Sequence, residues 1–196
     1  VTINMPSVLT ITLDKPVPGV RRVECEENLL IKGGGVTVGG GGGRINGSLD
    51  LSNYGRLAVD GGTLDVNGAT SVNFGTVRAL NSAQLNLPSL TAAEGLSIYA
   101  DLGGQVDAHN LTGITSYLDS TAVDGGQIEL SGITQIPTGG KLSVWCRGAN
   151  SLIDLSGVRG LGDYPTLRVE KGGKLVMDMT AMDLSLIHIS EPTRPY

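Results

Sequence analysis

The sequence predicts an all-β protein, a right-handed parallel β-helix with three short strands in each coil of about 21–25 residues. Three observations predict it: an apolar–polar–apolar triplet recurs at that spacing, glycine-rich turns separate the triplets, and aromatic residues are scarce. Thirty of the 196 residues are glycine, whereas the chain has a single Phe and a single Trp. Such a chain has to bury many small aliphatic contacts, and stacked coils give them a continuous core. The right hand is the usual chirality of parallel crossover connections.

The clearest repeat is a triplet in which an acidic or amide residue stands between two apolar residues. Successive central residues are 21, 21, 22, 25 and 24 positions apart, and each triplet alternates as a strand does. An earlier copy, Leu49-Asp50-Leu51, precedes Asp65 by 15 positions, so either one coil is short or the register slips there. The triplets are Leu64-Asp65-Val66, Leu85-Asn86-Leu87, Val106-Asp107-Ala108, Ile128-Glu129-Leu130, Ile153-Asp154-Leu155 and Met177-Asp178-Met179.

Two further apolar segments repeat in phase with these triplets, which gives three strands per coil. One of them runs from Ala69–Val72 through Leu90–Ala93 to Val158–Leu161. Turn signals such as Asp60-Gly61-Gly62 and Asp124-Gly125-Gly126 lie between the segments, and glycine supplies the positive φ values of a tight corner. The other segment predicts an inward column with a spacing of about 4.8 Å. Its members are Val59, Ala79, Ala100, Val123, Val144 and Val169.

The repeats resemble the Gly-rich parallel β-helix repeats of large secreted bacterial surface and adhesin-type proteins. Residues 104–114 and 126–136 carry the form G-G-x-L-x-L-x-x-L-T-x-L typical of those proteins. The resemblance covers roughly residues 49–183. It implies a non-enzymatic structural or adhesin-like scaffold, a truncated fragment of a larger secreted protein. It further implies an extracellular or cell-surface location, with glycans or surface proteins as partners.

The domain organisation follows from where the repeat begins and ends. Residues 1–48 are expected to form an N-terminal cap or irregular first coils, and residues 49–183 the solenoid repeats. Residues 184–196 form a tail of different origin, since Leu184–Arg194 matches the translation of a transposase adapter used in sequencing libraries. That tail carries no selected chemistry. The last coil is then expected to be uncapped near Asp183, which favours end-to-end self-association.

An outward row of acidic side chains is the only candidate site that the repeat predicts. Because the apolar members of each triplet face inward, the central residues face solvent and stack about 5 Å apart. Calcium could bridge such a row. Alternatively, the side chains splay into solvent and salt screens their repulsion. We predict no catalytic residue and no resident cofactor. The row consists of Asp65, Asp107, Glu129, Asp154 and Asp178, interrupted by Asn86.

Other classes of function are less well supported by the residues. The net charge of −5 and the lack of a basic cluster disfavour nucleic acid, and no apolar run is long enough to insert into a membrane. A fragment of a carbohydrate-active β-helix enzyme, either a polysaccharide lyase or a glycosidase, is the first alternative. A leucine-rich-repeat-like binding module is the second. His109 is expected at an exposed corner, and Tyr99 and Trp145 are expected to face different directions.

Overall fold

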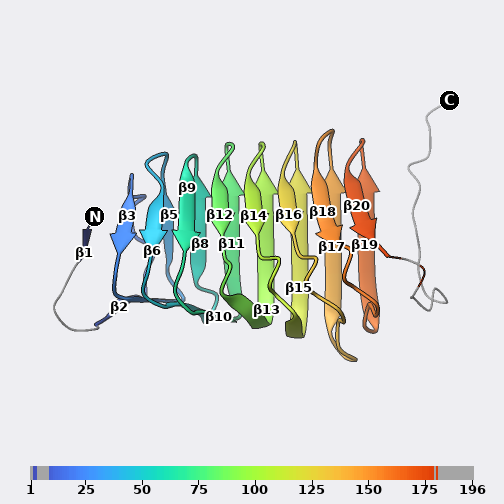
Figure 1. The fold of residues 1–196 in the computed structure, drawn as a ribbon, viewed down its shortest axis with the longest axis horizontal. Helices are drawn as coiled ribbons and strands as arrows, with labels where there is room; N and C mark the ends of the chain where they lie inside the picture. Colours follow the sequence, from blue (N-terminus) through green and yellow to red (C-terminus); the bar gives the residue numbers. More distant parts are fainter. Residues whose placement is uncertain (1, 4–8, 179, 181–196) are drawn as a thin grey trace.

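The computed structural model describes residues 2–3, 9–178 and 180 of the chain. All twenty elements assigned in those residues are β-strands, and every pairing between neighbouring strands is parallel. The strands stack as about eight coils along the long axis of the molecule (Figure 1). The chain is therefore a parallel β-helix, as predicted. A leucine-rich repeat, with one strand per repeat, does not describe it.

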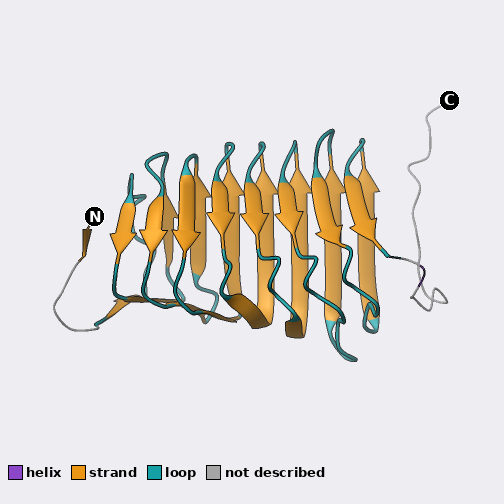
Figure 2. Cartoon of the chain, in the orientation of Figure 1, coloured by secondary structure: helices purple, strands orange, loops and turns teal. Residues whose placement is uncertain are grey.

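The first sheet contains nine strands and forms one side of every coil. In Figure 2 its strands follow one another as a row of parallel arrows, joined to the rest of each coil by short loops. Successive coils pair residues 21, 21, 22, 25 and 22 positions apart, from Thr63 to Lys174. Its strands are β1 (Thr2–Ile3), β3 (Val23–Cys25), β6 (Gly43–Ile45), β9 (Thr63–Val66), β12 (Gln84–Asn86), β14 (Gln105–Asp107), β16 (Gln127–Glu129), β18 (Leu152–Leu155) and β20 (Lys174–Met177).

The second sheet contains eleven strands and bends to supply the other two sides of the coils. One β-strand, β13, pairs with both β10 and β11, so it joins the two sides. Beyond β15 one of these sides is reduced to isolated bridges from Gly113 to Gln135 and on to Gly160. The strands are β2 (Thr10–Leu13), β4 (Asn28–Lys32), β5 (Gly35–Val38), β7 (Leu49–Ser52), β8 (Arg56–Asp60), β10 (Thr70–Asn73), β11 (Gly75–Leu80), β13 (Leu90–Asp101), β15 (Gly113–Val123), β17 (Lys141–Arg147) and β19 (Tyr164–Glu170).

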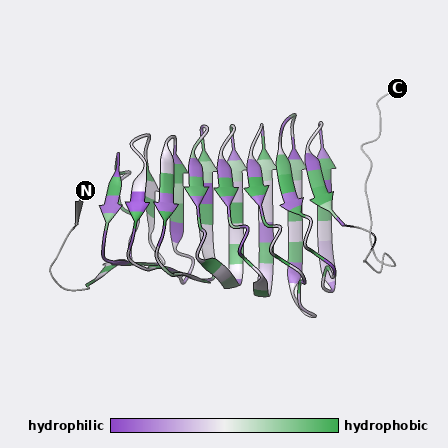
Figure 3. Cartoon of the chain, in the orientation of Figure 1, coloured by the Kyte–Doolittle hydropathy of each residue, from purple (hydrophilic) through white to green (hydrophobic). Residues whose placement is uncertain are grey.

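The core consists of inward columns of aliphatic side chains that continue from coil to coil. Leu64, Leu85, Val106, Ile128 and Ile153 are each 0–1% exposed and stack in one such column of the first sheet. Apolar and polar bands alternate along the strands in Figure 3. Since each coil covers the apolar side of the next, stacking and not the single coil provides the hydrophobic stabilisation.

The pairing corrects the predicted register in two places. Leu49-Asp50-Leu51 belongs to β7 of the second sheet, and Arg44 is the residue that precedes Asp65 in the acidic row. In the second sheet the inward column continues from Ala100 through Ala122 and Cys146, not through Val123 and Val144. Both errors have one cause. An alternating triplet can occur in strands of either sheet and at more than one place in a long strand, so only pairing decides which column its residues join.

The glycine-rich segment at residues 39–43 is a tight corner that requires glycine. Gly42 and Gly43 have φ values of +56° and +136°. A Cβ on Gly43 would lie 1.7 Å from the carbonyl oxygen of Val23 in the neighbouring coil. The run therefore allows two backbones to approach closely where β3 and β6 pair.

Candidate functional site

The outward acidic row lies on the first sheet and is shorter than predicted. Asp65, Asn86, Asp107, Glu129 and Asp154 occupy successive positions of one column, as the sequence predicted. Asp178 does not belong to it. The partner of Asp154 in the last coil is Val176, because the coils are offset by 22 residues there and not by 24. Toward the other end the column contains Glu24 and Arg44, whose side chains form an ion pair of 3.0 Å.

Three carboxylates of this row form hydrogen bonds with the corners that follow their own strands. Asp107 Oδ1 accepts the backbone N–H of His109 at 3.1 Å and lies 2.6 Å from its Nδ1. Asp154 Oδ1 accepts the backbone N–H of Ser156 at 2.8 Å, and Glu129 accepts that of Ser131 at 3.1 Å. A carboxylate two residues before a backbone donor is the usual way to fix such a turn. At these three positions the acidic residue thus has a structural role.

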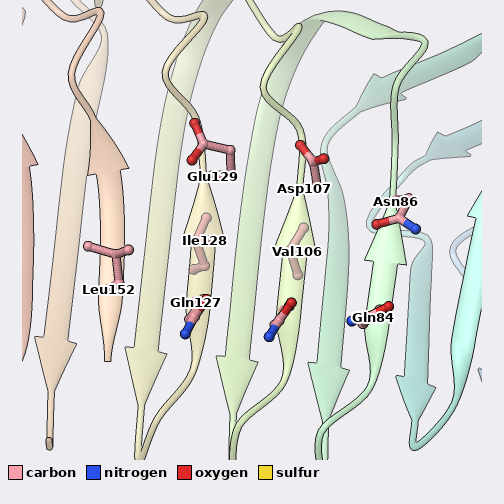
Figure 4. Close-up of a pocket in the computed structure, with 9 residues that line it drawn as sticks. Gln84, Asn86, Val106, Asp107, Gln127, Ile128, Glu129 and Leu152 are labelled. Atoms are coloured by element: carbon pink, nitrogen blue, oxygen red, sulfur yellow. The ribbon is translucent and has the colours of Figure 1, made fainter. Parts of the chain in front are cut away.

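A second outward column runs beside the acidic row and encloses a shallow groove with it. Gln84, Gln105 and Gln127 form this column, one residue from each of three successive coils. Figure 4 shows the amides of Gln84 and Gln127 on one side and the carboxylates of Asp107 and Glu129 on the other. The groove has a volume of about 270 Å³, and its floor includes Val106 and Ile128. Its amide and carboxylate groups can accept and donate hydrogen bonds to a polar polymer that lies along the axis.

Within the residues that the structure describes, no group of three or more His, Cys, Asp or Glu side chains is arranged to hold a metal ion. Asn86 Nδ2 donates to Asp65 Oδ1 at 2.6 Å, which satisfies one carboxylate without a cation. Calcium binding at Asp65, Asp107, Glu129 and Asp154 stays a prediction from the sequence.

The aromatic side chains of the described residues gather on the outward side of the second sheet, which the sequence did not indicate. Tyr99, Thr121 and Trp145 are successive residues of one outward column, so Tyr99 and Trp145 share a facing and lie two rungs apart. The expectation of different facings was wrong. The shared column could not be predicted from the spacing of 46 residues, because the two coils between Tyr99 and Trp145 have different lengths.

A row of rings borders this column at the corner where the strands begin. The ring centroids of Tyr54 and Phe74 are 6.1 Å apart, and those of Phe74 and Tyr117 are 6.0 Å apart. Gly95 lies between Phe74 and Tyr117, and a Cβ there would come within 2.8 Å of both rings. The missing side chain of Gly95 therefore lets two rings from non-adjacent coils meet. We call the outward side of β5, β8, β11, β13, β15, β17 and β19, together with this row, the aromatic face.

Trp145 on this face is held between arginines. The guanidinium carbons of Arg168 and Arg147 lie 5.4 Å and 6.0 Å from the ring centroid, within cation–π range. Arg168 also donates to Glu170, and this hydrogen bond holds the pKa of the Glu170 carboxyl below its usual value. The charges of Arg168 and Glu170 therefore neutralise one another, and the ring of Trp145 packs against the Arg168 guanidinium.

The aromatic face deepens into a second groove at its N-terminal end. This groove has a volume of about 860 Å³ and extends over β5, β8, β11 and β13. We call it the arginine groove, because Arg56 and Arg78 are the charged residues among its lining. The remaining lining consists of glycine, threonine, alanine, proline, valine, leucine and tyrosine residues. They are Pro16, Val17, Gly33, Gly34, Gly35, Val36, Thr37, Tyr54, Leu57, Ala58, Thr76 and Tyr99.

The fold and these two grooved faces define a β-solenoid protein with outward columns of polar and aromatic side chains. The sequence matches no protein-family model, and searches of curated proteins and of solved structures found no match. Within the described residues, no helix is long and apolar enough to cross a membrane.

Proposed function

We propose that this chain is a non-enzymatic structural or adhesin-like scaffold that works at the cell surface or outside the cell. One observation carries the proposal: the outward side chains form continuous columns across successive coils, on rungs fixed by a fully buried core. A rigid repetitive surface of this kind suits attachment to an extended partner, because equivalent contacts recur along the axis. Glycans and surface proteins are the partners that such a surface fits. The fold alone does not assign this function, since unrelated functions share it.

The catalytic alternative predicts a different arrangement of residues. Glycosidases need two carboxyl groups across a scissile bond, and lyases need a basic group that removes a proton. In the acidic row the carboxylates of Asp107 and Asp154 are engaged by their own corners. Arg78 and Arg168 share one outward column, but Tyr99, Thr121 and Trp145 separate them. This arrangement favours binding over turnover.

The test compares attachment with turnover in one preparation. The chain is immobilised and incubated with pectin, alginate and a panel of neutral glycans, and bound and released sugars are measured. We expect saturable attachment, lost when the chain is unfolded by heat, and no new reducing ends. Release of unsaturated uronides would overturn the scaffold in favour of a lyase. Absence of any attachment to glycans or to intact cells would overturn the adhesin-like role.

A further inference from the structure

We propose that the arginine groove binds an acidic glycan, a chain of sugars that carry carboxylate groups. This inference rests on the proposed function and names its ligand class. The groove runs along the axis across three rung spacings, about 14 Å, which is room for a few sugar units of an extended chain. Its position on the aromatic face sets it apart from the acidic row of the first sheet.

The shape of the groove follows from which side chains are small. On β5 and β8 the outward residues include Gly35, Thr37 and Ala58, and on β11 Thr76 is outward. Because these side chains are small, the floor of the groove lies close to the backbone of the sheet. Arg56 on β8 lies between Gly35 and Thr76 in the same outward column. The segment at Pro16–Val17 forms one wall, because Pro16 bridges to Gly35.

The charges of the groove are unbalanced and positive. Arg56 is exposed and has no acidic partner within the part of the chain that the structure describes. Arg78 is paired only loosely, with 3.8 Å between its Nη2 and Asp101 Oδ2. No carboxylate belongs to the lining, although the whole chain carries a net charge of −5. A guanidinium presents two parallel N–H donors that match a carboxylate, so two of them select an anion that carries carboxylates in series.

Two tyrosines at the borders of the groove favour a sugar over a simple anion. Tyr99 follows Arg78 in the outward column, and Tyr54 stands at the corner with 62% of its surface exposed. Both offer a ring face and a hydroxyl, a combination that can contact the C–H face of a sugar and its hydroxyl groups together. The Tyr99 hydroxyl lies 3.4 Å from Asp119 Oδ2, which holds the ring at the margin of the groove. An acidic peptide would fit the arginines but would leave these rings without a role.

The experiment is a titration of the full chain with a galacturonic acid hexamer, measured by calorimetry. A neutral galactose hexamer and sodium sulfate are titrated as matched probes. We expect the uronate to bind, the neutral sugar to bind at least tenfold more weakly, and sulfate not to saturate. Affinity should fall by about tenfold in Arg56→Ala and again in Arg78→Ala, and it should decrease with salt. Tyr99→Phe should bind nearly normally, whereas Tyr99→Ala should bind about tenfold more weakly.

Arg168→Ala is the control variant. Arg168 shares the outward column of Arg78 but lies outside the groove and is already paired with Glu170. Its replacement should leave uronate affinity unchanged. Equal binding of sulfate or of an acidic hexapeptide would overturn the glycan assignment, as would binding that survives loss of both groove arginines. If that double variant still attaches to cells and glycan-coated surfaces, the scaffold function stands and only the groove assignment fails. Lyase products would contradict the proposed scaffold function but would leave the assignment of the groove as a glycan-binding site unaffected.

Discussion

Single residues interrupt the regularity of the coils, and Ser120 is an example inside the core. Its neighbours in the adjacent coils of the same inward column are Ile98 and Val144. Ser120 is 0% exposed, and its hydroxyl makes no hydrogen bond with any described residue. A buried hydroxyl without a partner costs about 1–3 kcal/mol. The middle coils are therefore less stable than their aliphatic columns would suggest.

Ser120→Ala should raise the free energy of unfolding by about 1 kcal/mol, because it removes the unpaired hydroxyl and keeps the small volume. Urea unfolding followed by circular dichroism measures the change. Ser143→Ala, at a half-buried outward position of the next coil, serves as the control and should change stability by less than about 0.5 kcal/mol. A loss of stability in Ser120→Ala would show that the hydroxyl has a partner in solution.

Backbone conformation gives a second prediction at this scale. Gly43→Ala should lower stability by about 3 kcal/mol or more, because its φ of +136° is unfavourable for alanine and its Cβ would meet the Val23 carbonyl. Gly40→Ala is the matched control from the same glycine run, since no atom lies within 4 Å of its Cβ position. Thermal unfolding of both variants compares them. Equal losses would mean that the run acts through flexibility and not through the close approach at Gly43.

At the scale of strands, the sequence determined alternation well and register poorly. The inward columns of the first sheet were predictable, because strands such as β14 and β16 have only three residues each and allow a single choice of alternation. Longer strands were ambiguous. In β17 both Leu142-Ser143-Val144 and Val144-Trp145-Cys146 alternate, and only pairing with β15 selects the second for the column of Ala100. The aromatic face could not be predicted for the same reason, since it depends on the register of the seven strands from β5 to β19 that form it.

The acidic row gives a prediction that separates its structural role from its charge. Asp154→Ala should lower stability by about 1 kcal/mol, because the backbone N–H of Ser156 loses its acceptor. Asp154→Asn keeps an acceptor oxygen at the same place and should stay within about 0.5 kcal/mol of the parent. Urea unfolding in the presence of a calcium chelator distinguishes the two. If Asp154→Asn is as unstable as Asp154→Ala, the charge of the row matters more than its corner hydrogen bonds.

At the scale of the molecule, the last described coil leaves apolar side chains partly exposed. Val169, at the end of the Ala122–Cys146 column, is 37% exposed, whereas its predecessors are buried. We expect end-to-end self-association of the chain through this coil, seen as a concentration-dependent rise in sedimentation coefficient. Val169→Glu should reduce it, because a charge there opposes stacking of apolar ends. A monodisperse monomer at high concentration would contradict the expectation.

Coil-by-coil stacking also implies that local unfolding starts at the ends of the solenoid. The reaction rates of buried thiols can measure this local unfolding. Cys25 and Cys146 are buried and free, and burial raises the pKa of both thiols, so neither should react in the closed state. Cys25 lines an apolar cavity of about 240 Å³ in the first coils, where Ile11 and Val20 are only partly buried. The apolar side chains there are less completely covered, so we expect local opening at that end to cost less free energy than opening of the middle.

The measurement uses chains with a single thiol and a disulfide reagent under native conditions. Cys146→Ala reports on the first coils, Cys25→Ala on the last, and Ala100→Cys in the cysteine-free background on the middle. Ala100 is the matched probe for Cys146, because both occupy the same inward column two coils apart. We expect Cys25 to react fastest and the thiol at position 100 to react slowest, by on the order of tenfold or more for each step. Equal rates at the three positions would mean that the coils unfold as one cooperative unit, and the additive description of stacked repeats would then not apply to this solenoid.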